Sequence, residues 1–463
     1  MWMVAGLLLL ATSWFVLHGA ARIGMGASTD ISVIYASARA WVKGENPYDY
    51  AGLEQVLRRA DYVAPPETPE HPQGWPSPRW QPAVYPPTAL VLLAPLGWLT
   101  YPQVVVAWAV INLLLVAALI ALLIPLAGLE WVRRDRLYVG LLVAWALALG
   151  PVHSSLQLGQ LAVLVTLLIV LGAALAFQGQ NVGAGLLAAL ATGLKPQLGV
   201  ILVLYLLLRW RWRALLVAGA LLAALLAIGH AQMRLHGVEW IGPWLQNLRH
   251  YAQGGAGDPV YIYHQGVNPI LGPGNPERIQ LYNLQYPLHE IFGARASREV
   301  VNFVVLAATG LLVVAAVARS RGEDDGAGPE RELLLLSVLS LAAVLSCAHR
   351  FYALTVLVLP ITWFIRRWVR AADEGTPLPG IVRLGAVLLL AFPISTNTLF
   401  MWLGEKGFIP ATITGGPLFA AQGPGQWWWR DLVLPAQVWL LALLAVCLVW
   451  ALGSGGPHKP RVR

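Results

Sequence analysis

Residues 182–208 read VGAGLLAALATGLKPQLGVILVLYLLL, an apolar run that Lys195 and Pro196 interrupt at its middle. The run is long enough to cross a bilayer, which takes about 20 apolar residues. Proline cannot donate the backbone hydrogen bond that continues a helix, and a lysine at the centre of a spanning helix costs about 2.5 to 3.5 kcal/mol on insertion scales. The sequence therefore predicts two short helices that meet at Lys195 and Pro196, with the lysine at or below the outer surface of a membrane.

The composition of the whole chain also indicates a membrane environment. Hydrophobic residues make up 57% of the 463 residues and charged residues 12%, whereas about 25% of an ordinary soluble domain is charged. The formal net charge of +8 does not indicate nucleic acid as a partner, because the basic residues stand in small groups at the ends of apolar runs. Cys347 and Cys447 both fall inside apolar runs, which argues against a disulfide framework and against a cysteine-based metal site.

The apolar runs predict an all-α polytopic membrane protein in which residues 1–463 form a single integral membrane domain. Residues 1–21 are predicted to be the first spanning helix rather than a cleaved signal peptide, because no basic segment precedes them and their apolar core is long. The other runs are 103–128, 137–152, 160–177, 182–208, 213–231, 300–318, 332–348, 351–365, 381–398 and 432–452. About twelve crossings result when 182–208 is counted as two helices.

Loop charge predicts which ends face the cytoplasm, since short cytoplasmic loops are rich in Lys and Arg. The segments 22–102, 232–299 and 399–431 then lie on the periplasmic or extracytoplasmic side of a cell (inner) membrane. The basic groups assigned to the cytoplasm are Arg133, Arg134 and Arg136; Arg209, Arg211 and Arg213; Arg319, Arg321 and Arg331; Arg366, Arg367 and Arg370; and Lys459, Arg461 and Arg463. Arg22, directly after the first helix, does not follow this rule.

Two short helices are predicted within the first outer segment. Apolar residues recur at helical spacing from Ile31 to Val42, with Arg39 and Lys43 on the other face, which is typical of a helix that lies in the membrane interface. The apolar stretch 86–99 is too short to span a bilayer. It is predicted to be a re-entrant or interfacial helix.

Polar residues that could carry chemistry are far apart in sequence, yet all stand at predicted outer helix ends. Asp30 is either the N-cap of the helix that follows it or a general base. Lys195 either extends its ammonium to the surface or binds an anion. His349 and Arg350 either anchor a helix end or donate to a phosphate. A carboxylate base with cations at lipid-phosphate depth suits attack by a hydroxyl on a lipid-linked phosphate ester.

Further polar and aromatic residues fit a sugar substrate but also have structural explanations. Gln160 stands at another outer junction, where it could be a helix cap. The aromatic residues of segment 232–299 form either an interfacial belt or a surface for sugar rings. His264 and Asn268 of the same segment are available to sugar hydroxyls. The chain contains no GxxxxGK[ST], HExxH or GxSxG motif, so the usual signs of nucleotide hydrolysis, zinc proteolysis and α/β-hydrolase chemistry are missing.

Several of these motifs, taken in order over residues 28–365, resemble those of polyprenol-phosphate-mannose-dependent α-mannosyltransferases of the GT-C superfold, in particular glycosyltransferase family 87. The first motifs are Asp30 with Tyr35, then Gly44-Glu45-Asn46-Pro47-Tyr48 and Tyr85-Pro86-Pro87. The later ones are Gly159-Gln160, Gly183-Ala184-Gly185 leading to Leu194-Lys195-Pro196, the cluster Arg209 to Arg213, and His349 with Tyr352.

The resemblance implies a GT-C fold and an inverting transferase that moves a sugar, mannose by this analogy, from a polyprenyl phosphate to a glycan or glycolipid hydroxyl on the outer face. Asp30 would be the general base and Lys195 a contact to the donor phosphate, with His349 at the pocket and Arg350 as a further phosphate donor. Substrate contacts would come from Tyr35, Asn46, Tyr48, Gln160, Tyr352, His264 and Asn268. No Asp-x-Asp accompanies Asp30, so neither a metal nor another cofactor is predicted.

Two other functions stay open from the sequence. A broken helix with a lysine at its centre is also typical of a transporter or of a flippase for lipid-linked sugars. The same superfold also contains arabinofuranosyltransferases, so the transferred sugar could be a pentose. The predicted partners are in each case membrane lipids and lipid-linked substrates, not nucleic acid.

Overall fold

The fold is all-α. A computed structural model describes residues 2–23, 29–61, 83–130, 135–253, 282–292, 295–320, 328–347, 351–392 and 436–453, and these residues contain no β-strand. The helices are α1 (Trp2–His18), η1 (Ala20–Arg22), α2 (Thr29–Val42), α3 (Tyr50–Arg58), α4 (Pro87–Leu93), η3 (Ala94–Trp98), α5 (Tyr101–Leu126), α6 (Arg136–Ala148), α7 (Gly150–Leu158), α8 (Ala162–Phe177), α9 (Asn181–Leu194), α10 (Pro196–Leu208), α11 (Trp212–Leu235), α12 (Ile241–Gln253), α14 (Gln285–Phe292), α15 (Arg298–Ser320), α16 (Gly328–Ser346), η6 (Phe351–Leu357), α17 (Val358–Asp373), α18 (Gly380–Ala391) and α21 (Ala436–Gly453).

The polytopic membrane architecture is confirmed, while the count of twelve crossings stays a prediction. In the described part of the chain, six helices are long and apolar enough to cross a membrane, or seven if the α6–α7 pair, bent by 47°, is one span. Most of the other predicted crossings are shorter apolar helices of 10–17 residues, such as α8, α9 and α10. At 1.5 Å per residue, such helices are shorter than the roughly 30 Å hydrocarbon core.

The predicted break at Lys195 and Pro196 is confirmed. Helix α9 ends at Leu194 and α10 begins at Pro196, with Lys195 in an extended conformation between them. The two helices approach closely beside the break, because a Cβ at Gly199 would lie 2.3 Å from the backbone nitrogen of Thr192. Gly172 of α8 in turn contacts both arms, at Leu187 and Leu202. Helices α8, α9 and α10 therefore form one tightly packed unit around the lysine.

The helix predicted for the first outer segment is confirmed as α2, but protein encloses it. Residues 30–38 are all buried. Arg39 does not lie on an open polar face, since its Nη1 donates to the carbonyls of Gly97 and Leu99 at 3.2 and 2.7 Å. These carbonyls belong to the end of η3, where a helix leaves acceptors without partners. The arginine therefore caps η3 and fastens it to α2.

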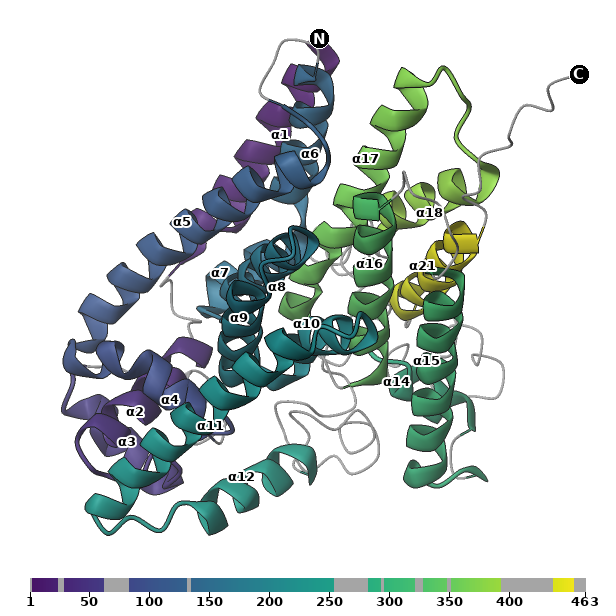
Figure 1. Ribbon diagram of the computed structural model, residues 1–463. Coiled ribbons are helices and arrows are strands. Elements are labelled where there is room, and N and C mark those ends of the chain that lie inside the picture. The colour runs from purple at the N-terminus through teal and green to yellow at the C-terminus, as the bar shows by residue number, and fades with distance from the viewer. Residues whose placement is uncertain are drawn as a thin grey trace, which may run out of the picture.

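Helix α12 covers the same end of the molecule as α2, α3 and α4 (Figure 1). Asn247 of α12 donates to the carbonyls of Tyr48 and Ala83 at 3.0 and 3.1 Å. Trp244 donates to the carbonyl of Val84 at 3.3 Å. The start of the second outer segment is thus joined to the first by hydrogen bonds.

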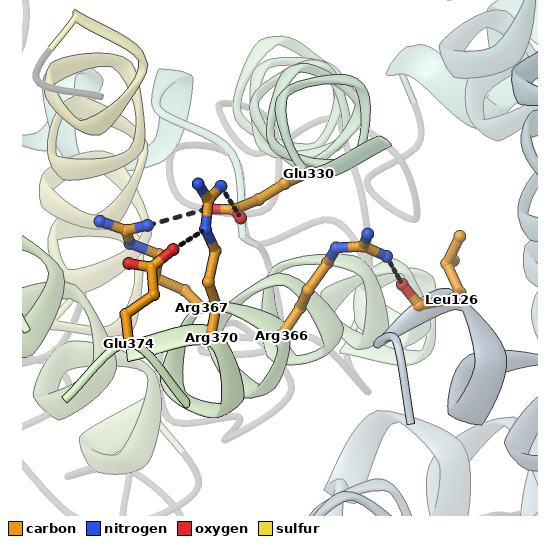
Figure 2. A network of polar contacts seen from close by, with 6 residues as sticks. All are labelled: Leu126, Glu330, Arg366, Arg367, Arg370 and Glu374. Carbon is orange, nitrogen blue, oxygen red and sulfur yellow. Dashed lines mark hydrogen bonds and ion pairs between the residues drawn. The ribbon is translucent and has the colours of Figure 1, made fainter. Parts of the chain in front are cut away.

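A charge network joins the ends of α5, α16 and α17 at another end of the bundle (Figure 2). Glu330 at the start of α16 pairs with Arg370 at 3.1 Å and with Arg367 at 3.6 Å. Arg366 donates to the carbonyl of Leu126, the last residue of α5, at 2.9 Å. A pocket of about 310 Å³ lies among these residues.

The polar contacts between helix ends connect ends that are predicted to lie on the same side of the membrane. Besides the network around Glu330, Arg209 pairs with Glu332 at 2.8 Å, and Arg319 donates to the carbonyl of Val449 at 3.0 Å. All of these ends are assigned to the cytoplasm by loop charge. The folded arrangement is therefore consistent with the predicted sorting of ends into two sets.

We expect Glu330→Gln to lower the free energy of unfolding by about 1 to 2 kcal/mol, between the values for exposed and for buried ion pairs. The Glu330 side chain is 13% exposed and forms ion pairs with two arginines. Glu374→Gln is the matched control, because the Arg370–Glu374 pair is 41% and 43% exposed, and its loss should cost less than about 0.5 kcal/mol. Thermal unfolding in one detergent compares the two, and equal shifts would contradict the expectation.

Candidate active site

Lys195 is the centre of the candidate site. It lies at the α9–α10 break with only 5% of its surface exposed. Its Nζ donates to Oε1 of Gln160 at 3.0 Å and lies 4.3 Å from the ring centroid of Tyr352. An ammonium over an aromatic ring is attracted by the negative face of the ring. The structure therefore brings together three residues that are far apart in the sequence and are each predicted as site residues.

The break itself is held by the first outer segment. Pro196 has no N–H and Lys195 is extended, so the carbonyls at the end of α9 lose partners that a continuous helix would supply. Thr88 of α4 supplies one, because its hydroxyl donates to the carbonyl of Gly193 at 2.8 Å in a buried position. The short helix after Tyr85-Pro86-Pro87 is thus part of the support for Lys195.

Asp30 stands at the start of α2, which packs against the Gly159–Gln160 turn. Gly159 ends α7 in the left-handed conformation, with φ +65°. A Cβ at Gly159 would lie 2.6 Å from Cβ of Ile31, so the start of α2 packs directly against this turn. Asp30 is 9% exposed and is the second residue of α2, which places it within the first turn rather than at the N-cap. A carboxylate there is favoured by the helix dipole.

Tyr352 is fixed by the packing of η6. The hydroxyls of Thr166 in α8 and Thr355 in η6 lie 2.7 Å apart in a buried hydrogen bond. Gly150, at the start of α7, leaves room for the ring of Phe351, which a Cβ there would meet at 2.8 Å. The ring beneath the ammonium therefore belongs to an element that contacts both α7 and α8.

Tyr35, Asn46 and Tyr48 have structural contacts within the first outer segment. The Tyr35 hydroxyl donates to the carbonyl of Leu99 at 2.7 Å, and that of Tyr48 to the carbonyl of Tyr85 at 2.9 Å. Asn46 accepts from the backbone N–H of Tyr48 at 3.0 Å. Burial raises the pKa of the Tyr48 phenol well above its usual value, and burial also raises the pKa of Tyr35, partly opposed by Arg39. Both phenols are hydrogen-bond donors at neutral pH.

Four predicted site residues, His264, Asn268, His349 and Arg350, lie outside the described residues, as does segment 399–431. Described residues near them in the chain join the second outer segment to α16 by hydrogen bonds. Gln285 donates to the carbonyl of Ser346 at 2.6 Å, and the backbone N–H of Leu284 donates to the carbonyl of Leu345 at 3.0 Å. The return of the second outer segment is thereby attached to the end of α16.

The pocket around Glu330 does not contain these residues. Its lining belongs to the ends of α5, α16 and α17, whereas Lys195 and Gln160 lie at the α9–α10 break and α2, which carries Asp30, packs against the Gly159–Gln160 turn. Within the described ranges, no group of three or more His, Cys, Asp and Glu side chains is placed to hold a metal ion. The described side chains of the candidate site are a carboxylate, a buried ammonium and neutral hydrogen-bonding groups.

Comparison with known families assigns the chain. The sequence profile of glycosyltransferase family 87 matches residues 83–345, more than half of the protein. The chain belongs to glycosyltransferase family 87. No curated protein and no solved structure matches it.

Membership of glycosyltransferase family 87 confirms the predicted family and makes the protein a membrane glycosyltransferase, with a sugar donor and an acceptor as its substrates. Of the two classes that the broken helix permits, transferase and transporter, the family supports the first. The matched region includes Gln160 and Lys195. Asp30 and Tyr352 lie outside it and are connected to the matched region by the contacts above.

Two residues that support the candidate site are not predicted from the sequence. Thr88 holds the α9 end and Trp108 donates its indole N–H to the carbonyl of Gly159 at 2.9 Å. Trp108 stands in an apolar run, where a tryptophan has no distinguishing pattern. Thr88 could have been noticed as the single hydroxyl directly after Pro86 and Pro87, in a stretch already identified as a short helix.

We expect Thr88→Val to destabilise the glycosyltransferase by about 1 to 3 kcal/mol, the cost of leaving a buried carbonyl without a donor. Thr192→Val is the matched control, because the Thr192 hydroxyl is buried but makes no hydrogen bond within the described residues. Its loss should cost little or nothing. Thermal unfolding of both variants in the same detergent checks this, and an equal effect of the two would show that the bond to Gly193 contributes nothing.

Proposed function

We propose that the protein is an inverting glycosyltransferase that transfers mannose from a polyprenyl-phosphate donor to a hydroxyl of a glycan or glycolipid acceptor. The observation that carries the proposal is the position of Lys195, a buried ammonium held by Gln160 and Tyr352 at a turn against which the helix of Asp30 packs. Such an arrangement offers a base on α2 and a phosphate contact at the adjoining turn. A lipid-linked sugar phosphate needs both.

Asp30 acts in this proposal as the general base. Its carboxylate takes the proton of the acceptor hydroxyl while the acceptor oxygen forms a bond to the anomeric carbon, on the face opposite the leaving group. The bond between the anomeric carbon and the phosphate oxygen breaks, and its electron pair remains on that oxygen. A second carboxylate for protonating the leaving group is unnecessary because a phosphate leaves as an anion, unlike the alkoxide that glycosidases must protonate.

Lys195 acts in this proposal on the leaving group. The donor is a phosphodiester with one negative charge, and the departing polyprenyl phosphate gains a second charge as the glycosidic bond breaks. An ammonium near that phosphate therefore stabilises the transition state more than the bound donor, which is the condition for raising kcat. His349 and Arg350, which follow the end of α16, are proposed as further contacts to the same phosphate.

The proposed site faces the periplasm or extracytoplasmic side of the cell (inner) membrane. Loop charge supports this orientation, because the segments rich in arginine are at the other helix ends. The aromatic residues of the outer segments, with His264, Asn268 and Gln160, are proposed to contact sugar hydroxyls and rings. Arabinofuranose in place of mannose is the alternative sugar.

We expect Asp30→Asn and Asp30→Ala to lower the rate of sugar transfer by about 10² to 10⁴-fold, the usual contribution of a general base. The assay uses membranes that contain the variant, supplied with radiolabelled polyprenyl-phosphate mannose, and measures label in the acceptor fraction. Asp61→Asn is the control, because Asp61 is an exposed residue of the same outer segment with φ +60°, a conformation that asparagine tolerates.

Wild-type rates in both Asp30 variants would exclude Asp30 as the base. Label transferred from a polyprenyl-phosphate pentose and not from the mannose donor would replace mannose by arabinofuranose as the transferred sugar.

We expect Lys195→Gln to lower kcat by about 10 to 100-fold, which corresponds to the 1.5 to 3 kcal/mol of a hydrogen bond to a charged group. The donor KM should change less than kcat, because the second phosphate charge forms only during transfer. Lys43→Gln removes the charge of an exposed lysine and should leave both constants unchanged. A rise in KM with an unaltered kcat would contradict the proposed role in departure of the leaving group.

A further inference from the structure

The turn formed by Gly159 and Gln160 contacts both halves of the proposed site. Gly159 adopts φ +65°, and the backbone N–H of Gln160 donates to the carbonyl of Ser155 at 2.9 Å, so the end of α7 is tightly closed. Its glycine leaves no room for a Cβ beside Ile31. Its glutamine accepts the hydrogen bond of Lys195. One turn thus determines where the start of α2 and the ammonium lie relative to each other.

Trp108 of α5 forms a hydrogen bond to this turn from a separate helix. Its indole Nε1 donates to the carbonyl of Gly159 at 2.9 Å in a buried position, and 5% of the side chain is exposed. A carbonyl at a helix end has no partner within its own helix, so the indole supplies a bond that the turn itself lacks. Trp108 is in turn fixed in α5, where Asn112 donates to its backbone carbonyl at 2.9 Å.

We propose that Trp108 is a positioning residue for sugar transfer, which sets the place of Asp30 relative to Lys195 through the Gly159–Gln160 turn. The inference rests on the proposed function for its effect on catalysis. The described contacts of Trp108 place its indole on the turn and not on Asp30 or Lys195, so it acts through the backbone. Small displacements of catalytic groups reduce rates strongly, with about 10²-fold lost for 1 Å.

The main test is Trp108→Phe, which removes the indole N–H and keeps an aromatic ring. We expect kcat to fall by about tenfold while the donor KM changes less than about twofold, since misplacement of reacting groups acts in the transition state. Trp363→Phe is the matched control, because the indole N–H of Trp363 is also buried but has no hydrogen-bond partner within the described residues. It should leave kcat unchanged. Equal losses in the two variants would overturn the proposal.

A second variant pair perturbs the same turn from the side of α2. Gly159→Ala places a Cβ against Ile31 and should also lower kcat more than it raises KM. Gly179→Ala carries the same strain of a positive φ, since Gly179 has φ +76°, but its added Cβ meets nothing within 4 Å. A loss of activity in Gly159→Ala that Gly179→Ala reproduces would show that backbone strain, not displacement of α2, is responsible, and would count against the proposal.

Amide hydrogen exchange separates this inference from the proposed function, because it needs no donor. Trp108→Phe should speed exchange at residues 155–161 and at the start of α2, and Trp363→Phe should not. Unchanged exchange at these amides overturns the positioning role whatever the substrate. If wild-type protein transfers no sugar from the polyprenyl-phosphate donor, the proposed function fails. Faster amide exchange in Trp108→Phe but not in Trp363→Phe would still show that Trp108 holds the Gly159–Gln160 turn.

Discussion

A buried ammonium in an apolar bundle is the constraint around which the described part of this glycosyltransferase is arranged. Lys195 is only 5% exposed, and a charge removed from water costs several kcal/mol unless other groups compensate. Gln160 and Tyr352 contribute a dipole and a ring face, and the helix break beside them brings its own carbonyls that need donors. The burial of Lys195 therefore depends on contacts from α4, from the turn after α7 and from η6.

The outer helices serve this arrangement by being rigid. Helix α2 carries Asp30 at its start and is enclosed by protein along residues 30–38, with Arg39 and Tyr35 bonded to the end of η3. The contacts of Asn247 extend the same rigidity to the second outer segment. A carboxylate on such a helix has a defined position, whereas one on a free interfacial helix would depend on the depth of that helix in the lipid. Preorganisation of this kind is what proton transfer in a transition state requires.

Features that come from a repeating sequence pattern can be predicted from the sequence, whereas contacts made by one isolated polar residue cannot. The apolar runs, the break at Lys195 and Pro196 and the helix from Ile31 to Val42 follow from periodicity and from proline chemistry, and the structure confirms the break and the helix. Loop charge sorted the helix ends in a way that the contacts of Glu330 and Arg319 agree with. The enclosure of α2 was missed because an amphipathic pattern looks the same against lipid headgroups and against η3. Thr88 and Trp108 were missed because one polar atom in an apolar stretch has no pattern, and its importance depends on a distant carbonyl.

Charged side chains fix two regions of the fold. At the ends of α16 and α17, Arg367 and Arg370 lie against Glu330, so opposite charges largely cancel and the contacts join helices. At the α9–α10 break, Lys195 contacts the neutral groups of Gln160 and Tyr352, which orient its ammonium. In the proposed reaction the departing phosphate gains charge, and a hydrogen bond from an ammonium to it becomes stronger as that charge develops. Gln160 stands on a turn that Trp108 holds, and it accepts the hydrogen bond of Lys195. The position of this turn therefore sets where the ammonium of Lys195 lies.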